Sequence, residues 1–357
     1  MSTYSNETYS AILARAQGNV SDDVLKTEGS LVFNALSVLA YELEKIYIQM
    51  DFIGEQAHAS TADYEHLKLI AADRGLTPKE ASCAEVKATA DAELPIGTRT
   101  NLKAYNYRVA EKLEDGSYRM VCEEAGSGPN GLKGEVIMID FVDGLNSCTI
   151  TELLTPGEDY ESQESFYKRY LESFTTTSFA GNIAAYKEQQ KAVAGIGGAK
   201  IYPVWNGGGT VKAVLISSDF TVPSEYLVSQ VQGQFCPTPS EGYGVAPIGH
   251  DFTAAAVLAE NVTVKTSIQF ESGYDYSSLK TAIEDKVKEY LHGLAKTWEE
   301  SSNLTVYISR LESAVLDVKG IADITGTTLN GASANLVLDA DAIPTFLSME
   351  VTTIERE

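Results

Sequence analysis

Residues 30–59 read SLVFNALSVLAYELEKIYIQMDFIGEQAHA, and this stretch decides the fold. Apolar side chains recur along it at alternating steps of four and three, a heptad pattern held over roughly three and a half heptads. We call these positions the helix seam; they are Val32, Leu36, Leu39, Leu43, Ile46, Met50, Ile53 and Ala57. The pattern predicts a long helix whose narrow apolar seam packs lengthwise against other helices.

The same periodicity leaves an alternative open. A helix that packs only within its own domain usually shows a broader apolar stripe than this seam. Other large apolar side chains do lie outside the seam and widen it, which indicates more than one neighbour. They are Leu31, Phe33, Tyr41, Tyr47 and Phe52. An ordinary core helix and a bundle shared with other subunits therefore both fit the pattern.

Composition limits the kinds of partner. The chain has 357 residues, enough for about two to three domains, and 44% of them are hydrophobic, which suffices for packed cores. Its net charge is −23 and its pI is near 4.5. Such a chain repels phosphate backbones and anionic lipid surfaces, so we expect neither a nucleic acid nor a membrane as partner.

The cysteines and the N-terminal residues indicate the cellular compartment in which the chain acts. Four scattered cysteines without a C-x-x-C pair argue against a disulfide framework and a zinc site, and favour buried free thiols. The polar first nineteen residues lack the apolar core of a signal peptide. No apolar stretch reaches the about eighteen residues that span a membrane. We therefore expect the chain to act in the cytoplasm or to leave the cell by a route other than secretion.

Changes of periodicity along the chain predict four domains. Helical spacing gives way to strand-like alternation near Glu85, Thr155-Pro156-Gly157 marks a second boundary, and a third lies near residue 262. The predicted domains are a helical bundle-forming segment (1–80), a β-rich domain (81–154), an α+β domain (155–262) and a C-terminal α+β domain (263–357). The fold class is thus multidomain α+β: an N-terminal helical segment with a long coiled-coil-like helix, a small β-rich domain, then α+β modules.

Several turns are predicted from residue type alone. Asn330-Gly331 is a strong hairpin signal between strands over 323–329 and 334–338. The glycine run after Asn206 allows a tight reversal between two strands, and Gly75 suits a left-handed helix C-cap. The chain is expected to end on an edge strand over 346–354. The structural turn residues are Gly75, Gly207, Gly208, Gly209, Asn330 and Gly331.

No residue pattern rises to the level of catalysis. The glycines of 195–200 follow a helix and open a strand, the reverse of a phosphate-binding loop, and their spacing does not fit one. Asp339 and Asp341 are too few for calcium, and no nucleophile motif is present. The four histidines, His58, His66, His250 and His292, form no metal-binding motif. We therefore predict no enzyme activity, no cofactor and no metal site.

Separated segments in a fixed order resemble the baseplate J-like family of contractile phage tails and related injection particles. Each segment is weak by itself, and their order makes the resemblance specific. The segments are Thr27–Leu31, Tyr64–Leu67, Asp73–Leu76, Pro95–Thr98, Thr155–Gly157, Tyr167–Leu171, Gly181–Asn182, Val204–Val211, Gly242–Gly249 and Leu329–Gly331. The β-rich region over 85–150 follows the family pattern only loosely.

The resemblance implies a structural baseplate wedge subunit. Such a subunit pairs with a second copy of itself and a smaller wedge protein, and links to neighbouring wedges, the tail hub and sheath-proximal proteins. It assembles in the host bacterial cytoplasm into a phage tail or a phage-tail-like particle and relays the trigger for sheath contraction. The alternatives are a tail-associated receptor- or carbohydrate-binding or hydrolytic component, marked by exposed aromatics or a pair of buried acids, and an enzyme with an unrecognised pocket.

Overall fold

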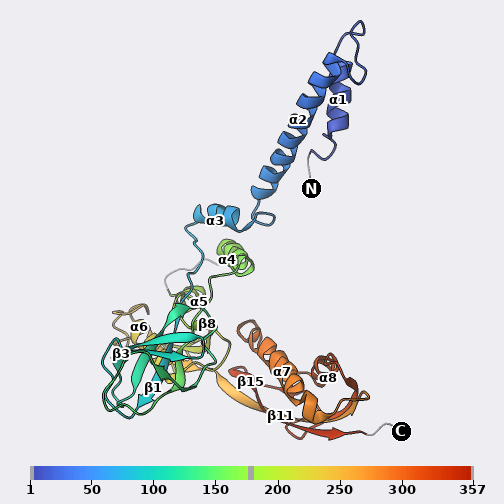
Figure 1. Ribbon diagram of the computed structural model, residues 1–357. Helices are drawn as coiled ribbons and strands as arrows, with labels where there is room; N and C mark the ends of the chain where they lie inside the picture. The colour runs from blue at the N-terminus through green and yellow to red at the C-terminus, as the bar shows by residue number, and fades with distance from the viewer. Residues whose placement is uncertain (1–3, 176–180, 355–357) are drawn as a thin grey trace. The chain divides into compact units, whose positions relative to one another are not determined.

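The computed structural model describes residues 4–175 and 181–354, which form two compact units (Figure 1). One unit comprises Met1–Glu80 together with Glu161–Thr176, and the other comprises Ala81–Tyr160 together with Thr177–Glu357. The predicted multidomain α+β class is confirmed. The finer division into four domains stays a prediction.

The first unit is helical. Its elements are α1 (Tyr9–Gly18), α2 (Leu31–Gln56), α3 (Tyr64–Ala72) and α4 (Gln163–Thr175). Each of the first three begins at a side-chain cap, in which Thr8, Ser30 or Asp63 accepts a backbone N–H from the first turn. The long helix predicted from the seam is therefore present over 26 residues. Its coiled-coil pairing stays a prediction, since the structure describes a single chain.

The helix α4 belongs to the first unit, although its residues were expected in the third predicted domain. Phe166 is fully buried in a cluster with Leu67 and Ala71 of α3. Arg169 holds the Glu161 carboxylate with two hydrogen bonds, at 3.0 and 2.7 Å. Helical periodicity showed that α4 has an apolar face but could not show which distant helix that face meets.

Residues 81–160 form a seven-stranded antiparallel sheet in the order β5-β7-β1-β4-β3-β2-β6. The strands are β1 (Cys83–Ala90), β2 (Arg99–Leu102), β3 (Tyr105–Lys112), β4 (Tyr118–Ala125), β5 (Gly134–Glu135), β6 (Ile137–Met138) and β7 (Cys148–Thr155). The end strands β5 and β6 are consecutive in the chain, so the sheet closes on itself. The segment 134–138 is thus divided, and its two short strands pair with opposite edges of the sheet.

The central module is a three-stranded sheet with two helices. Its elements are α5 (Ile183–Lys191), β8 (Ile196–Pro203), β9 (Thr210–Ser217), α6 (Glu225–Phe235) and β10 (Asp251–Ala256). The strand β9 lies in the middle, antiparallel to β8 and parallel to β10. Stacked rings of Tyr186, Phe235 and Phe252 fill the core. The loops before β9 and before β10 therefore lie at the same end of the sheet.

The C-terminal module packs two helices on a second three-stranded sheet. Its elements are β11 (Leu258–Phe270), α7 (Tyr276–Ala295), the 3₁₀ turn η1 (Trp298–Glu300), β12 (Thr305–Val306), α8 (Ile308–Leu316), β13 (Ile321–Leu329), β14 (Leu336–Val337) and β15 (Ala342–Thr353). β15 is an edge strand, as expected, and runs parallel to β11. The predicted hairpin partner is wrong: β14 pairs with β12, whereas β13 pairs with β11.

A buried contact joins the central and C-terminal modules. The carbonyl oxygen of Ala340 accepts hydrogen bonds from Trp298 Nε1 at 3.0 Å and from Lys200 Nζ at 2.6 Å. The Lys200 ammonium also lies 4.6 Å from the centre of the Trp298 ring. Burial lowers the pKa of Lys200. Trp298 is fully buried at this contact.

Candidate partner-binding surface

The face of α2 that meets α1 is not the seam. Ile12 and Leu13 of α1 pack around Ala40, whose small side chain allows the two helices to approach closely. The Tyr9 N–H donates to Glu44 Oε1 at 2.7 Å, which fixes the register of the two helices. The α1-facing residues of α2 are Phe33, Leu36, Ser37, Ala40, Glu44 and Tyr47. The heptad pattern did not predict this face, although the small side chains of Ser37 and Ala40 at its centre indicate a close helix contact.

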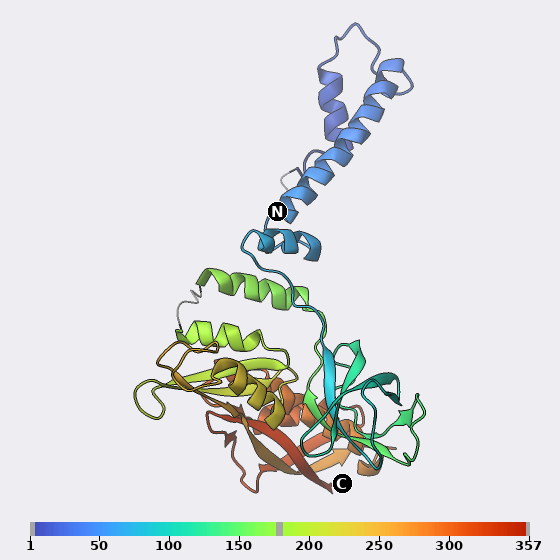
Figure 2. The ribbon, with the colours of Figure 1, turned by 90° about the vertical axis from the view of Figure 1, so that its left-hand side faces the viewer.

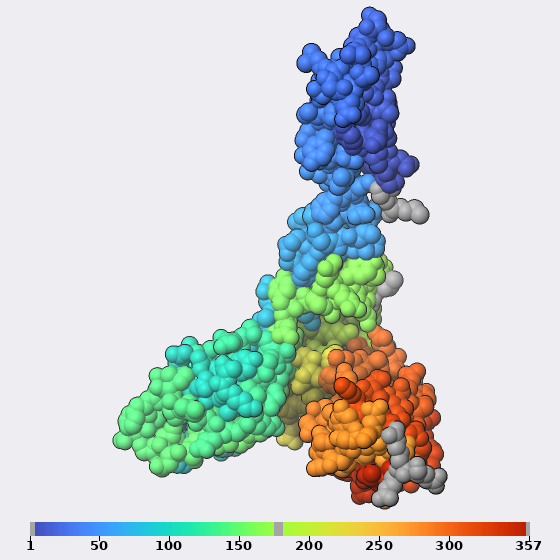
Figure 3. Space-filling model, turned by 45° about the vertical axis from the view of Figure 1, so that its right-hand side comes forward, coloured from blue at the N-terminus to red at the C-terminus, as the bar shows by residue number. Residues whose placement is uncertain are grey.

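Most of the seam is uncovered. Leu39, Leu43, Ile46, Met50 and Ile53 are between 40% and 66% exposed. Val32 and Leu36 are half-buried, Ala57 is exposed at the C-cap, and only Leu36 is shared with the α1-facing set. In Figure 3 α1, in dark blue, covers one side of α2 and leaves the neighbouring side open. A stripe of large apolar side chains over several helical turns marks an interaction site.

A second apolar stripe lies on the other side of the α1 contact. Tyr41, Ile48 and Phe52 are all exposed. With about 100° between successive residues of a helix, these side chains lie roughly opposite the seam. The Lys45 ammonium sits 4.3 Å from the Tyr41 ring and is otherwise paired with Glu42. Apolar side chains thus surround much of α2, as expected for a helix enclosed by several neighbours.

The turn residues lie where the chain needs positive φ, with one exception. Gly75, just beyond α3, has φ of 74° and its N–H donates to the carbonyl oxygen of Ala72. Asn330 and Gly331 have φ of 50° and 82°. In the reversal between β8 and β9, Gly207 and Gly209 adopt positive φ, whereas Gly208 does not. These glycines and this asparagine shape turns.

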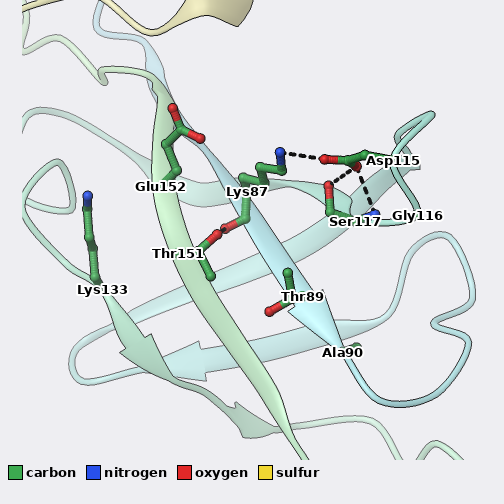
Figure 4. Close-up of a pocket in the computed structure, with 9 residues that line it drawn as sticks. All are labelled: Lys87, Thr89, Ala90, Asp115, Gly116, Ser117, Lys133, Thr151 and Glu152. Carbon is green, nitrogen blue, oxygen red and sulfur yellow. Dashed lines mark hydrogen bonds and ion pairs between the residues drawn. The ribbon is translucent and has the colours of Figure 1, made fainter.

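The closed sheet carries a shallow polar hollow (Figure 4). Lys87 and Asp115 face each other across it with Nζ and Oδ2 2.6 Å apart, and Ser117 donates to the same carboxylate. These bonds hold the pKa of Asp115 well below its ordinary value. A general acid needs the opposite shift, so this carboxyl cannot supply a proton near neutral pH. Lys133, Thr151 and Glu152 line the other side of the hollow.

Other reactive groups are buried or dispersed. Burial raises the pKa of Cys148 to about 11 and also raises the pKa of Cys122. Neither thiol is therefore a nucleophile at neutral pH. Within 4–175 and 181–354, no group of three or more His, Cys, Asp or Glu could hold a metal ion. Among the helices of that same part of the chain, none has the length and apolarity needed to cross a membrane.

Comparison with known proteins assigns the family. The family model described as the baseplate J-like central domain matches residues 178–256, and that of the C-terminal domain matches residues 262–352. The phage-like element PBSX protein XkdT of Bacillus subtilis (strain 168) is 30% identical over 346 residues, 96% of each chain. This chain belongs to the baseplate J-like family. The resemblance inferred from the ordered sequence segments is thereby confirmed.

A further relative carries the baseplate name itself. Baseplate protein gp47 of Escherichia phage Mu is 24% identical over 343 residues, covering 90% of this chain and 92% of that protein. The cryo-EM structure of the anti-feeding prophage baseplate aligns with 95% of this chain and 89% of the other chain, at a TM-score of 0.40 and 10% identity. The chain is a baseplate protein of a phage or a contractile injection system.

Proposed function

We propose that this baseplate J-like protein is a structural wedge subunit. Its N-terminal hairpin of α1 and α2 joins a bundle with a second copy and a smaller wedge protein, and its C-terminal modules link neighbouring wedges around the tail hub. The subunit relays the trigger for sheath contraction by exchanging one arrangement of these contacts for another. We further propose that it assembles in the host bacterial cytoplasm and acts without catalysis.

The uncovered seam carries this proposal. Five large aliphatic side chains stay exposed along one face of α2 while α1 occupies a different face. Because such side chains favour burial by roughly 1.5–3 kcal/mol each, the hairpin is stabilised when another helix covers them. The second stripe of Tyr41, Ile48 and Phe52 supports a second neighbour. Two stripes match a bundle with two kinds of partner helix.

The non-catalytic role is supported by the state of the reactive groups. The carboxyl of Asp115 is paired and acidic, and the Cys148 and Cys122 thiols are held in their neutral form by burial. These protonation states are the opposite of those that acid–base or thiol catalysis requires.

Light scattering of the purified full chain tests the assembly proposal. We expect a mass of two or more copies for the chain alone, and a larger stable complex when it is co-expressed with a small baseplate protein from the same tail. Removal of residues 1–57, which keeps α3 and its contact with α4, should abolish both complexes while 58–357 stays folded by circular dichroism. A full-length chain that remains monomeric, both alone and after co-expression, would contradict the wedge assignment.

A further inference from the structure

The strand β10 lies at one end of the three-stranded sheet of the central module, so one of its edges faces no other strand of that sheet. Just beyond β10, the Val257 N–H donates to Leu215 O of β9 at 2.9 Å. The N–H and C=O groups of successive residues in a strand point to opposite sides within the sheet. Those of Phe252, Ala254 and Ala256 therefore point away from β9, to the open edge. Such an edge can pair with a further strand.

A side-chain amide already occupies part of this edge. Gln232 of α6 donates from Nε2 to the carbonyl oxygen of Phe252 at 2.9 Å, and its Oε1 accepts the N–H of Ala254 at 2.8 Å. A residue of a parallel neighbouring strand makes the same two bonds, one to a carbonyl and one to the N–H two residues further along. The Gln232 amide thus takes the place of one peptide group of a fourth strand.

Beyond Gln232 the edge of β10 opens into a groove beside α6. Val228 and Ser229 of α6 line one side, Ala254 and Ala256 of β10 line the other, and the volume is about 340 Å³. Figure 2 shows α6, in dark yellow, in front of the sheet of the central module. The volume is near the lower end of the about 300–1,000 Å³ of ligand pockets, so the groove has room for a few residues of extended chain and not for a folded domain.

Two backbone groups on this stretch of the edge are open. The Ala254 carbonyl oxygen and the Ala256 N–H have no hydrogen-bond partner among the residues that the structure describes. They repeat, two residues further along β10, the spacing of the carbonyl and the N–H that Gln232 holds. One residue of an added parallel strand would bond to both groups.

A groove between an edge strand and a helix fits the extended chain of a peptide. Peptides that add a strand to a sheet edge gain affinity from main-chain hydrogen bonds and specificity from pockets for alternate side chains. Here Val228 gives an apolar wall, and the small side chains of Ala254 and Ala256 leave room for a larger side chain of the peptide.

Charge favours a basic peptide. Glu225, in the first turn of α6, is a charged residue that lines the groove. Its side chain is exposed and forms no ion pair with the described part of the chain. A Lys or Arg of the peptide would be attracted to this carboxylate. A second copy of this chain, with a net charge of −23, brings the same sign of charge to it, so a basic segment of a different protein is favoured.

We propose that this groove binds an extended, basic segment of a different protein, which adds to β10 as a fourth, parallel strand. The segment donates to Ala254 O, accepts from the Ala256 N–H, and places an apolar side chain against Val228 and a basic one beside Glu225. The inference rests on the proposed function only in taking that protein from the same tail. The competing interpretation is that Gln232 merely blunts the edge against aggregation.

Peptides that tile the other baseplate proteins of the same tail test the proposal. Labelled peptides of about twelve residues, longer than a typical strand, are titrated with the wild-type full chain and followed by fluorescence anisotropy. We expect one peptide, with its overlapping neighbours, to bind with a Kd of about 10–100 μM, because few contacts offset the cost of ordering the peptide. Methylating its backbone nitrogens one at a time should weaken binding by about tenfold at every second residue, because only alternate N–H groups of an added strand face β10.

Matched variants locate the peptide on the chain. Ser229→Trp should fill the groove and abolish binding, whereas Gln230→Trp, at the next exposed position of α6, should leave it unchanged. Glu225→Lys should weaken binding of the basic peptide by about fivefold, because an attraction at the surface becomes a repulsion. All three changes are at exposed positions, and circular dichroism should show the wild-type fold for each.

The outcomes separate this inference from the proposed function. The absence of any binding peptide, or binding that survives Ser229→Trp, would overturn the inference and leave Gln232 as edge protection. Equal weakening at every methylated nitrogen would also overturn it, because the peptide would then not lie as a strand. If the chain forms its complexes through the seam but binds no peptide, the inference fails and the proposed function stands. If a peptide binds while the chain stays monomeric after co-expression, the proposed bundle is refuted and the groove stands.

Discussion

Replacing Leu39 and Leu43 by Asp should separate folding from assembly. Both side chains are already largely in water in the free chain, at 60% and 41% exposure, so the fold of the hairpin loses little. A partner helix can bury about half of each side chain, which is worth about 1 kcal/mol per leucine from a full burial energy of about 1.5–3 kcal/mol. Losing both weakens pairing by about 2 kcal/mol, or roughly thirtyfold. The two new carboxylates must also lose their hydration when the seam pairs, which weakens pairing further.

The assay is sedimentation velocity on the full chain at low micromolar concentration, with helix content followed by circular dichroism. We expect the wild-type complex to fall to a monomer at unchanged helicity. Asn34→Asp with Gln49→Asp is the matched control, because it makes the same charge change on exposed polar positions of α2 and should leave the mass unaltered. Double-variant protein that keeps the wild-type mass would refute the assignment of the seam as a contact. A double variant that loses both its helix content and the mass of the complex would show that the seam side chains stabilise the fold of the single chain.

Four further predictions concern stability. Arg169→Met should lower the free energy of unfolding of the helical unit by about 2–4 kcal/mol, because the buried Glu161 carboxylate loses both hydrogen bonds from the guanidinium. Urea denaturation followed by circular dichroism at 222 nm measures this change. Gly331→Val should cost about 1–2 kcal/mol, since φ of 82° is left-handed. Gly233→Ala, inside α6 with open space around a new Cβ, should instead stabilise the protein by about 0.5–1 kcal/mol. The same urea denaturation measures both glycine variants. Because burial raises the pKa of Cys148 from 9.0 to about 11, unfolded thiols ionise first as the pH rises. The free energy of unfolding should therefore fall between pH 9 and 11. Over this range the urea midpoint of Cys148→Ala should fall less steeply with pH than that of the wild-type protein.

Local features of the fold could be read from residue order. The heptad spacing predicted α2, because the period of apolar side chains depends only on near neighbours in the chain. The positive φ of Asn330 and Gly331 was equally readable, because few residues tolerate it. The family was readable too, since many separated turn and packing residues occur in one order.

Contacts between distant segments could not be read in the same way. The hairpin signal at Asn330-Gly331 correctly marks a turn, yet β14 pairs with β12, because residue type specifies a turn but not the strand that the chain meets after it. The seam was visible as a stripe, but α1 covers the neighbouring face around Ala40. Periodicity identifies which side chains share a face, while the partner of that face depends on every other surface competing for it.

The sequence by itself therefore determined the long helix, the α+β class, the acidic character, and membership in the baseplate J-like family. These properties depend on near neighbours in the chain or on residue order. Tertiary structure alone decided that α4 joins the N-terminal helices, that β5 and β6 close their sheet, and that α1 covers the face of α2 around Ala40. Each of those outcomes depends on packing between residues far apart in sequence, where loop-closure entropy and competing surfaces set the result.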